Sequence, residues 1–169
     1  KAEVMNDYRT AAISRETSLL GRKEVLTGKA KFGIFGDGKE VAQIALSKAF
    51  QHGDWRSGYY RDQTFMFATG MSDIRKFFAQ LYADPDTSHD PHSAGRQMNS
   101  HFATQMVDES GQVLDLVNRK NLTSGMAPTA SQMPRSVGLA LASKLFRHSD
   151  PLQSFTELSN KGNEVCFAT

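Results

Sequence analysis

The stretch Val165-Cys-Phe-Ala-Thr169 is an uncharged, largely apolar run that predicts a buried β-strand. An apolar helix is predicted before it at residues 131–146, and a turn at Gly162 separates the two. A buried strand normally leads into a turn and a helix on the same sheet. In open α/β sheets, ligands lie beyond the carboxyl ends of the strands. We therefore expect residues that follow Thr169 in a longer protein to contact a ligand.

Other helices are predicted from apolar residues that recur at helical spacing. In the first, residues 7–29, this pattern includes Tyr8, Leu19 and Leu26. The helix at 131–146 is apolar on most faces, so we expect it to be buried. The remaining predicted helices are residues 39–50, 62–68 and 72–82, the last with Ser72 as its N-cap. Residues 53–58 are predicted to be a polar break, and residues 83–112 a long loop.

The stretch GIFGDGKEV, residues 33–41, looks like two cofactor motifs. It has the spacing of a phosphate-binding P-loop, but Glu40 stands where that motif needs a hydroxyl, and its carboxylate would repel phosphate. Its Gly-Asp-Gly could begin a thiamine metal motif, but the required Asn is missing, since no Asn lies between Gly38 and Asn99. We therefore interpret this stretch as a glycine turn followed by a helix that Asp37 caps.

Composition limits the class of protein. The chain has 169 residues, of which 39% are hydrophobic and 22% charged, which predicts one globular domain. A net charge of +2 with mixed signs gives no case for nucleic acid or an anionic membrane as a partner. The single cysteine, Cys166, excludes an internal disulfide framework and favours the cytoplasm. Because it lies in an apolar run, we interpret it as a small buried hydrophobe.

Three motifs then point to one family. They are Gly58-Tyr-Tyr-Arg-Asp62, Gly95-Arg-Gln-Met98 with His101 after it, and Ala127-Pro-Thr-Ala-Ser-Gln-Met-Pro134 followed by Val137-Gly138. In this order they resemble the alpha chain of the thiamine-diphosphate-dependent 2-oxoacid dehydrogenases. The GRQM motif followed by His is more similar to the branched-chain (2-oxoisovalerate) type than to the pyruvate type.

This resemblance implies that residues 1–169 are an incomplete thiamine-diphosphate-binding domain, the N-terminal part of an alpha chain. The implied fold class is α/β, with helices packed on a parallel sheet. The Gly-Asp-Gly motif that holds Mg²⁺ would follow after Thr169, so we expect this part alone to be inactive. The implied reaction is oxidative decarboxylation of a branched-chain 2-oxo acid, with acyl transfer to a lipoyl group. The implied partners are a beta chain or fused beta domain and a lipoyl acyltransferase, without nucleic acid or membrane.

Two alternatives to this function remain open. One is the alpha chain of a pyruvate or acetoin dehydrogenase. The other is a non-catalytic helical binding module whose polar loop contacts a protein. A Gly-Asp-Gly motif encoded beyond Thr169 would favour the enzyme, and a stop codon there would favour the module.

The resemblance assigns the cofactor's diphosphate to Tyr60 and Arg61, with a weaker role for Tyr59. The chemistry suits these residue types, because a guanidinium is a permanent cation with a planar fork that matches phosphate oxygens. The alternative is a surface Arg61 paired with the neighbouring Asp62.

The resemblance also implies that Ala127 and Thr129 lie under the cofactor. Thr129 departs from the family, which often has Leu or Ile there. The same segment would bind a monovalent cation, K⁺, through oxygen atoms, which are the ligands that a hard cation prefers. The implied cation ligands are Met126, Pro128, Ser131 and Gln132. The alternative is an ordinary helix N-cap by Thr129 or Ser131.

His101 is the candidate catalytic residue. A histidine in a polar loop can hydrogen-bond a substrate carboxylate or relay a proton near neutral pH. The alternative is a solvated loop histidine with no such role. His89 and His92 are close in sequence, but no third ligand follows at a fixed offset, which argues against a transition-metal site.

Overall fold

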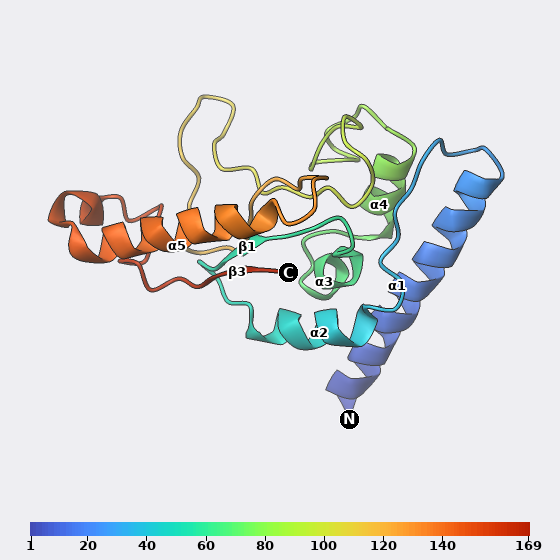
Figure 1. The fold of residues 1–169 in the computed structure, drawn as a ribbon, viewed down its shortest axis with the longest axis horizontal. Helices are drawn as coiled ribbons and strands as arrows, with labels where there is room; N and C mark the ends of the chain where they lie inside the picture. Colours follow the sequence, from blue (N-terminus) through green and yellow to red (C-terminus); the bar gives the residue numbers. More distant parts are fainter. The chain divides into compact units, whose positions relative to one another are not determined.

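The computed structural model describes residues 1–169 and divides into two units. Unit 1 consists of Lys1–Ala49 and Tyr60–His101, and unit 2 of Phe50–Tyr59 and Phe102–Thr169. Unit 1 is helical, with α1 (Ala2–Leu26), α2 (Glu40–Ala49), α3 (Gln63–Ala68) and α4 (Ile74–Leu81). Within it, the long helix α1 contacts each of the other three (Figure 1). Its apolar core includes Ile44, Phe65, Met66, Phe77 and Leu81.

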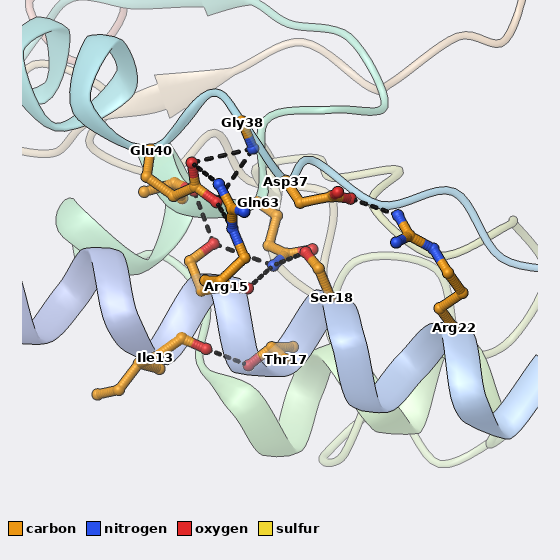
Figure 2. A network of polar contacts seen from close by, with 11 residues as sticks. Ile13, Arg15, Thr17, Ser18, Arg22, Asp37, Gly38, Glu40 and Gln63 are labelled. Atoms are coloured by element: carbon orange, nitrogen blue, oxygen red, sulfur yellow. Dashed lines mark hydrogen bonds and ion pairs between the residues drawn. The ribbon is translucent and has the colours of Figure 1, made fainter.

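Helix α1 buries a polar face, although the helix was predicted from the spacing of its apolar residues. Tyr8 and Leu26 are 70% and 80% exposed, whereas the buried residues are Ser14, Thr17, Ser18, Gly21 and Glu24. Small side chains let α3 approach closely, and hydrogen bonds pair most of the buried polar groups, although the Gln63 Oε1 has no partner. The oxygens of Ser14 and Thr64 are 2.6 Å apart, and the Gln63 amide donates to Ser14. The same amide donates to the hydroxyl of Ser18 (Figure 2). The helix is confirmed over most of its predicted length.

Two predicted caps are wrong. The Asp37 carboxylate accepts a hydrogen bond from Arg22 at 2.7 Å and does not cap α2 (Figure 2). Helix α4 is capped by Asp73, whose carboxylate accepts from the N–H of Lys76 at 3.0 Å, so Ser72 is not its N-cap. Asp37 lies too far before Glu40, the first residue of α2, to cap it, and at α4 the adjacent Ser72 and Asp73 are both good cap residues.

The loop predicted at residues 83–112 contains no helix or strand, as expected. Its first part, up to His101, belongs to unit 1 and folds around polar side chains. Asp90 is fully buried and accepts hydrogen bonds from the Ser93 hydroxyl at 2.6 Å and the Gly95 N–H at 2.9 Å. The Asn99 amide pairs with both backbone groups of Ile34, at 2.9 and 2.6 Å. This part of the loop therefore has a fixed internal structure.

Unit 2 contains a parallel sheet in the order β2-β1-β3, which confirms the α/β fold class. The strands are β1 (Trp55–Ser57), β2 (Asn121–Leu122) and β3 (Cys166–Ala168), with Trp55 opposite both Asn121 and Cys166. Helix α5 (Gln132–His148) packs against β1 and β3 and is followed by the 3₁₀ helix η1 (Asp150–Ser154) (Figure 1). The strand predicted at residues 165–169 is confirmed as β3, but its residues are only half-buried, so the predicted burial of the strand and of Cys166 is wrong. Strand β1 was predicted to be a polar break, which is wrong.

Helix α5 was predicted to be buried, and this is also wrong. Its only buried residue is Gln132, and Val137, Leu141 and Leu145 are 69%, 55% and 52% exposed. The reason is that three short strands can cover only one side of a helix of this length. None of the helices combines the length and apolar character needed to cross a membrane.

Candidate functional site

Unit 1 brings Tyr60, Arg61 and His101 together. The Arg61 guanidinium lies over the Tyr60 ring, 5.8 Å from its centroid. The same ring stacks with His101, with centroids 6.4 Å apart and planes inclined by 22°. Tyr60 and Arg61 come from one motif, and His101 comes from another, 40 positions after Arg61. The three side chains therefore form a single stack.

Arg61 is exposed and forms no ion pair, so the predicted alternative in which it pairs with Asp62 is wrong. Its backbone is tightly packed, because a Cβ added to Gly36 would lie 2.6 Å from the Arg61 carbonyl oxygen. The glycine that looked like part of a metal motif thus permits the close approach of two backbone segments. The guanidinium itself stays available to an anionic ligand.

His101 is only 3% exposed, so the alternative of a solvated loop histidine is wrong. Its backbone is held by the Gln80 amide, which donates to the His101 carbonyl at 2.8 Å and accepts from its N–H at 3.3 Å. Its Nδ1 lies 3.3 Å from the Asn99 carbonyl oxygen, and its Nε2 is buried without a hydrogen-bond partner. A proton on Nδ1 would be donated to Asn99 and leave Nε2 as an acceptor.

Unit 2 brings Tyr59, Ala127 and Thr129 together. The Tyr59 hydroxyl lies 3.0 Å from the Thr129 hydroxyl and donates to the Ala127 carbonyl oxygen at 3.3 Å. The Pro128 carbonyl accepts from the N–H of Ser131 at 3.2 Å, which closes a turn directly before α5. In this turn Ala130 has a φ of 67°, a left-handed conformation that a residue with a side chain adopts at a cost.

Two oxygen atoms of this segment have no partner. The Ser131 hydroxyl and the Gln132 Oε1 are both buried without a hydrogen bond. Gln132 uses only its Nε2, which donates to the Thr169 carbonyl at 3.0 Å. Ser131 stands at the N-cap position of α5, as the alternative expected, but its side chain makes no capping hydrogen bond. Four other side-chain oxygens of the chain are also buried without a partner, so the two are candidate ligands because they are adjacent and lie in the motif at residues 127–134.

Met126 and its neighbour Ser124 are held from α5. The Arg135 guanidinium donates to the Met126 sulfur and to the Ser124 carbonyl oxygen. Since the Met126 sulfur already has this cationic donor, any contribution of Met126 to a cation site would come from its carbonyl oxygen.

An ion pair that the sequence did not reveal fixes the start of α2. Glu40 is 8% exposed, and its two carboxylate oxygens accept from Arg15 at 2.7 and 3.1 Å (Figure 2). They also accept from the N–H of Gly38, at 3.1 and 3.0 Å. Hydrogen bonds from Arg15 lower the pKa of Glu40 to about 2. Because a carboxylate already occupies the Gly38 N–H, residues 33–41 do not offer it to phosphate.

Comparison with known proteins adds an independent observation. Residues 8–169 match the family described as the dehydrogenase E1 component. The chain is similar to the 2-oxoisovalerate dehydrogenase subunit alpha of Bacillus subtilis (strain 168), with 30% identity over 148 residues. This alignment covers 85% of the chain and 38% of the relative, so the chain spans well under half of that protein. The family match covers nearly all of the chain, and the chain therefore belongs to the dehydrogenase E1 component family.

Proposed function

We propose that the chain is part of the alpha component of a thiamine-diphosphate-dependent 2-oxoacid dehydrogenase that acts on a branched-chain 2-oxo acid. Membership of the E1 family supports the reaction class. The name of the Bacillus subtilis relative supports 2-oxoisovalerate as the substrate. A beta chain or fused beta domain and a lipoyl acyltransferase complete the proposed assembly.

The observation that carries this proposal is the exposed guanidinium of Arg61, which lies against Tyr60 and forms no ion pair. A diphosphate needs several strong donors, and a guanidinium supplies two parallel N–H groups to phosphate oxygens. An Arg61 already neutralised by a carboxylate would not fit this role. The residues therefore fit the diphosphate of the cofactor, with Arg61 as its main ligand and Tyr60 beside it.

The segment Met126–Gln132 fits a monovalent cation. The unpartnered oxygens of Ser131 and Gln132 are neutral side-chain oxygens, and the backbone carbonyls of Met126 and Pro128 are neutral as well. Neutral oxygen ligands suit a weakly charged hard cation such as K⁺, whereas Mg²⁺ in proteins usually has carboxylate ligands. The hydrogen-bonded pair of Tyr59 and Thr129 would then hold this segment in place.

When bound, thiamine diphosphate supplies the electron sink that lets a 2-oxo acid lose CO₂. The residues of this chain would bind and orient the cofactor and the substrate. Arg61 and Tyr60 would hold the diphosphate, and Ala127 and Thr129 would support the ring. His101 presents Nε2, a buried nitrogen without a partner, which suits a hydrogen bond or proton transfer at the substrate.

Calorimetric titration tests the proposal. Thiamine diphosphate with Mg²⁺ is titrated into the full-length protein with its beta partner, beside the variants Arg61→Ala and Arg9→Ala. Arg9 is an exposed arginine of α1 and controls for the loss of one positive charge. We expect Arg61→Ala to weaken binding roughly 10- to 100-fold, the usual value of charge-assisted hydrogen bonds, and Arg9→Ala to leave it unchanged.

Failure of the unsubstituted protein to bind would contradict the assignment of the cofactor. Equal binding by the Arg61→Ala variant would contradict the role of Arg61 alone. A higher kcat/KM for pyruvate than for 2-oxoisovalerate would overturn the branched-chain assignment and leave the reaction class intact.

A further inference from the structure

Gln43, on α2, makes two hydrogen bonds to the backbone around Arg61. Its Nε2 donates to the Arg61 carbonyl oxygen at 2.7 Å, and its Oε1 accepts from the N–H of Phe65 at 2.9 Å. Both partners belong to one short segment, and both bonds come from one side-chain amide. The amide therefore closes a bridge across the turn that carries Arg61.

The bond to Phe65 replaces a missing helix cap. Phe65 is the third residue of α3, a position whose N–H has no partner within the helix and normally bonds to the side chain of the N-cap. The N-cap of α3 is Asp62, and its side chain makes no such bond. Gln43 supplies the acceptor from a different helix, so the start of α3 depends on the position of α2.

The position of α2 is fixed in turn. Glu40, three residues before Gln43, is tied to Arg15 of α1 and to the N–H of Gly38 (Figure 2). Gly36 packs directly on the Arg61 backbone, and a side chain there would collide with it. A chain of contacts therefore leads from α1 through Glu40 and Gln43 to Arg61.

From this geometry we infer that Gln43 is a positioning residue for Arg61, and that Gly36 serves the same purpose. The inference rests on the proposed role of Arg61 in binding the diphosphate. The guanidinium is exposed and held only by its contact with Tyr60, so the backbone determines where it can reach. Without the Gln43 bridge the Arg61 guanidinium would be less well positioned. A binding group that is less ordered before the diphosphate arrives binds it more weakly.

The test compares thiamine diphosphate with thiamine monophosphate, both titrated with Mg²⁺ into the full-length protein and its beta partner. The ratio of the two dissociation constants reports the contact with the terminal phosphate. We expect Gln43→Ala to weaken diphosphate binding about five- to ten-fold, the order of the cost of ordering one side chain on binding, with a smaller effect on the monophosphate. Gly36→Ala should lower the preference for the diphosphate in the same direction. Gln112→Ala, an exposed glutamine whose side chain makes no hydrogen bond, is the control.

An equal loss of affinity for both ligands would show a purely structural role and overturn the inference. An unchanged preference for the diphosphate in the Gln43→Ala protein, beside a lowered preference in the Arg61→Ala protein, would overturn it while the proposed function stands. Absence of thiamine diphosphate binding by the unsubstituted protein would refute both, so the two failures are distinguishable.

Discussion

Glu40→Gln offers the sharpest test of how unit 1 is held together. The substitution keeps the size of the side chain and removes the charge that two nitrogens of Arg15 contact. The pKa of Glu40 is lowered from 4.5 to about 2. Because the folded state depresses this pKa, the carboxylate stabilises the protein above pH 4.5, and this stabilisation is lost as the pH falls towards about 2.

The magnitude follows from this lowered pKa. A pKa that falls by one corresponds to about 1.4 kcal/mol, which sets a ceiling of roughly 3 kcal/mol for Glu40. The side chain of Arg15 is 48% exposed, and solvent screening reduces the value. We therefore expect Glu40→Gln to lower the free energy of unfolding by about 1–2 kcal/mol at pH 7, in line with other hydrogen bonds to charged groups.

Equilibrium urea unfolding followed by circular dichroism, from pH 7 to pH 2.5, measures both the size of the effect and its pH dependence. The difference in free energy of unfolding between the unsubstituted protein and Glu40→Gln should shrink as the pH falls below 4.5, because the stabilisation by the Glu40 carboxylate is being lost. Asp37→Asn is the matched control, since Asp37 pairs with the half-exposed Arg22 and should contribute well under 1 kcal/mol. A difference that stays constant across this pH range would refute the assignment of the effect to the Glu40 charge.

Three further predictions concern packing, backbone and reactivity. Phe77→Ala should cost about 3–5 kcal/mol in thermal unfolding because Phe77 is fully buried, whereas Ile74→Ala on the same helix, 43% exposed, should cost less than half of that. Gly95→Ala should destabilise more than Gly111→Ala, because both have positive φ but only at Gly95 would a Cβ collide with backbone, 2.6 Å from Ala83; equal melting temperatures would contradict this. Burial raises the pKa of Cys166 to about 11, so its alkylation by iodoacetamide at pH 8 should be much slower in the native protein than in urea, and equal rates would exclude a protected thiol.

The sequence was a good guide to helices and a poor guide to which faces they bury. Helices α1 to α5 lie close to the predicted ranges because local spacing specifies a helix. The choice of buried face depends on partners far along the chain, such as Gln63 and Thr64 for α1. Strand β1 was missed because Arg56 and Ser57 are polar, although the central position in the sheet buries both.

In the candidate site too, some residues could be predicted from the sequence and others could not. Motifs singled out Tyr60, Arg61 and His101, and the structure places them in one stack. Gln43 could not be found in this way, because a glutamine on a short helix gives no signal until its partners, 18 and 22 positions later, are known. Likewise, the sequence could not show that the oxygens of Ser131 and Gln132 have no partner, because one sequence does not specify which side-chain atoms are buried.

The polar contact between α1 and α3 also restricts how the two helices can slide. An apolar seam can shift by one helical turn, about 5.4 Å, and still bury a comparable surface. Here such a shift would separate the Ser14 and Thr64 hydroxyls and remove the acceptors of the Gln63 amide, leaving several buried groups without partners. Helix α1 therefore has one favourable register on α3. This register also determines where Arg15 of α1 meets Glu40 at the start of α2, the helix that carries Gln43.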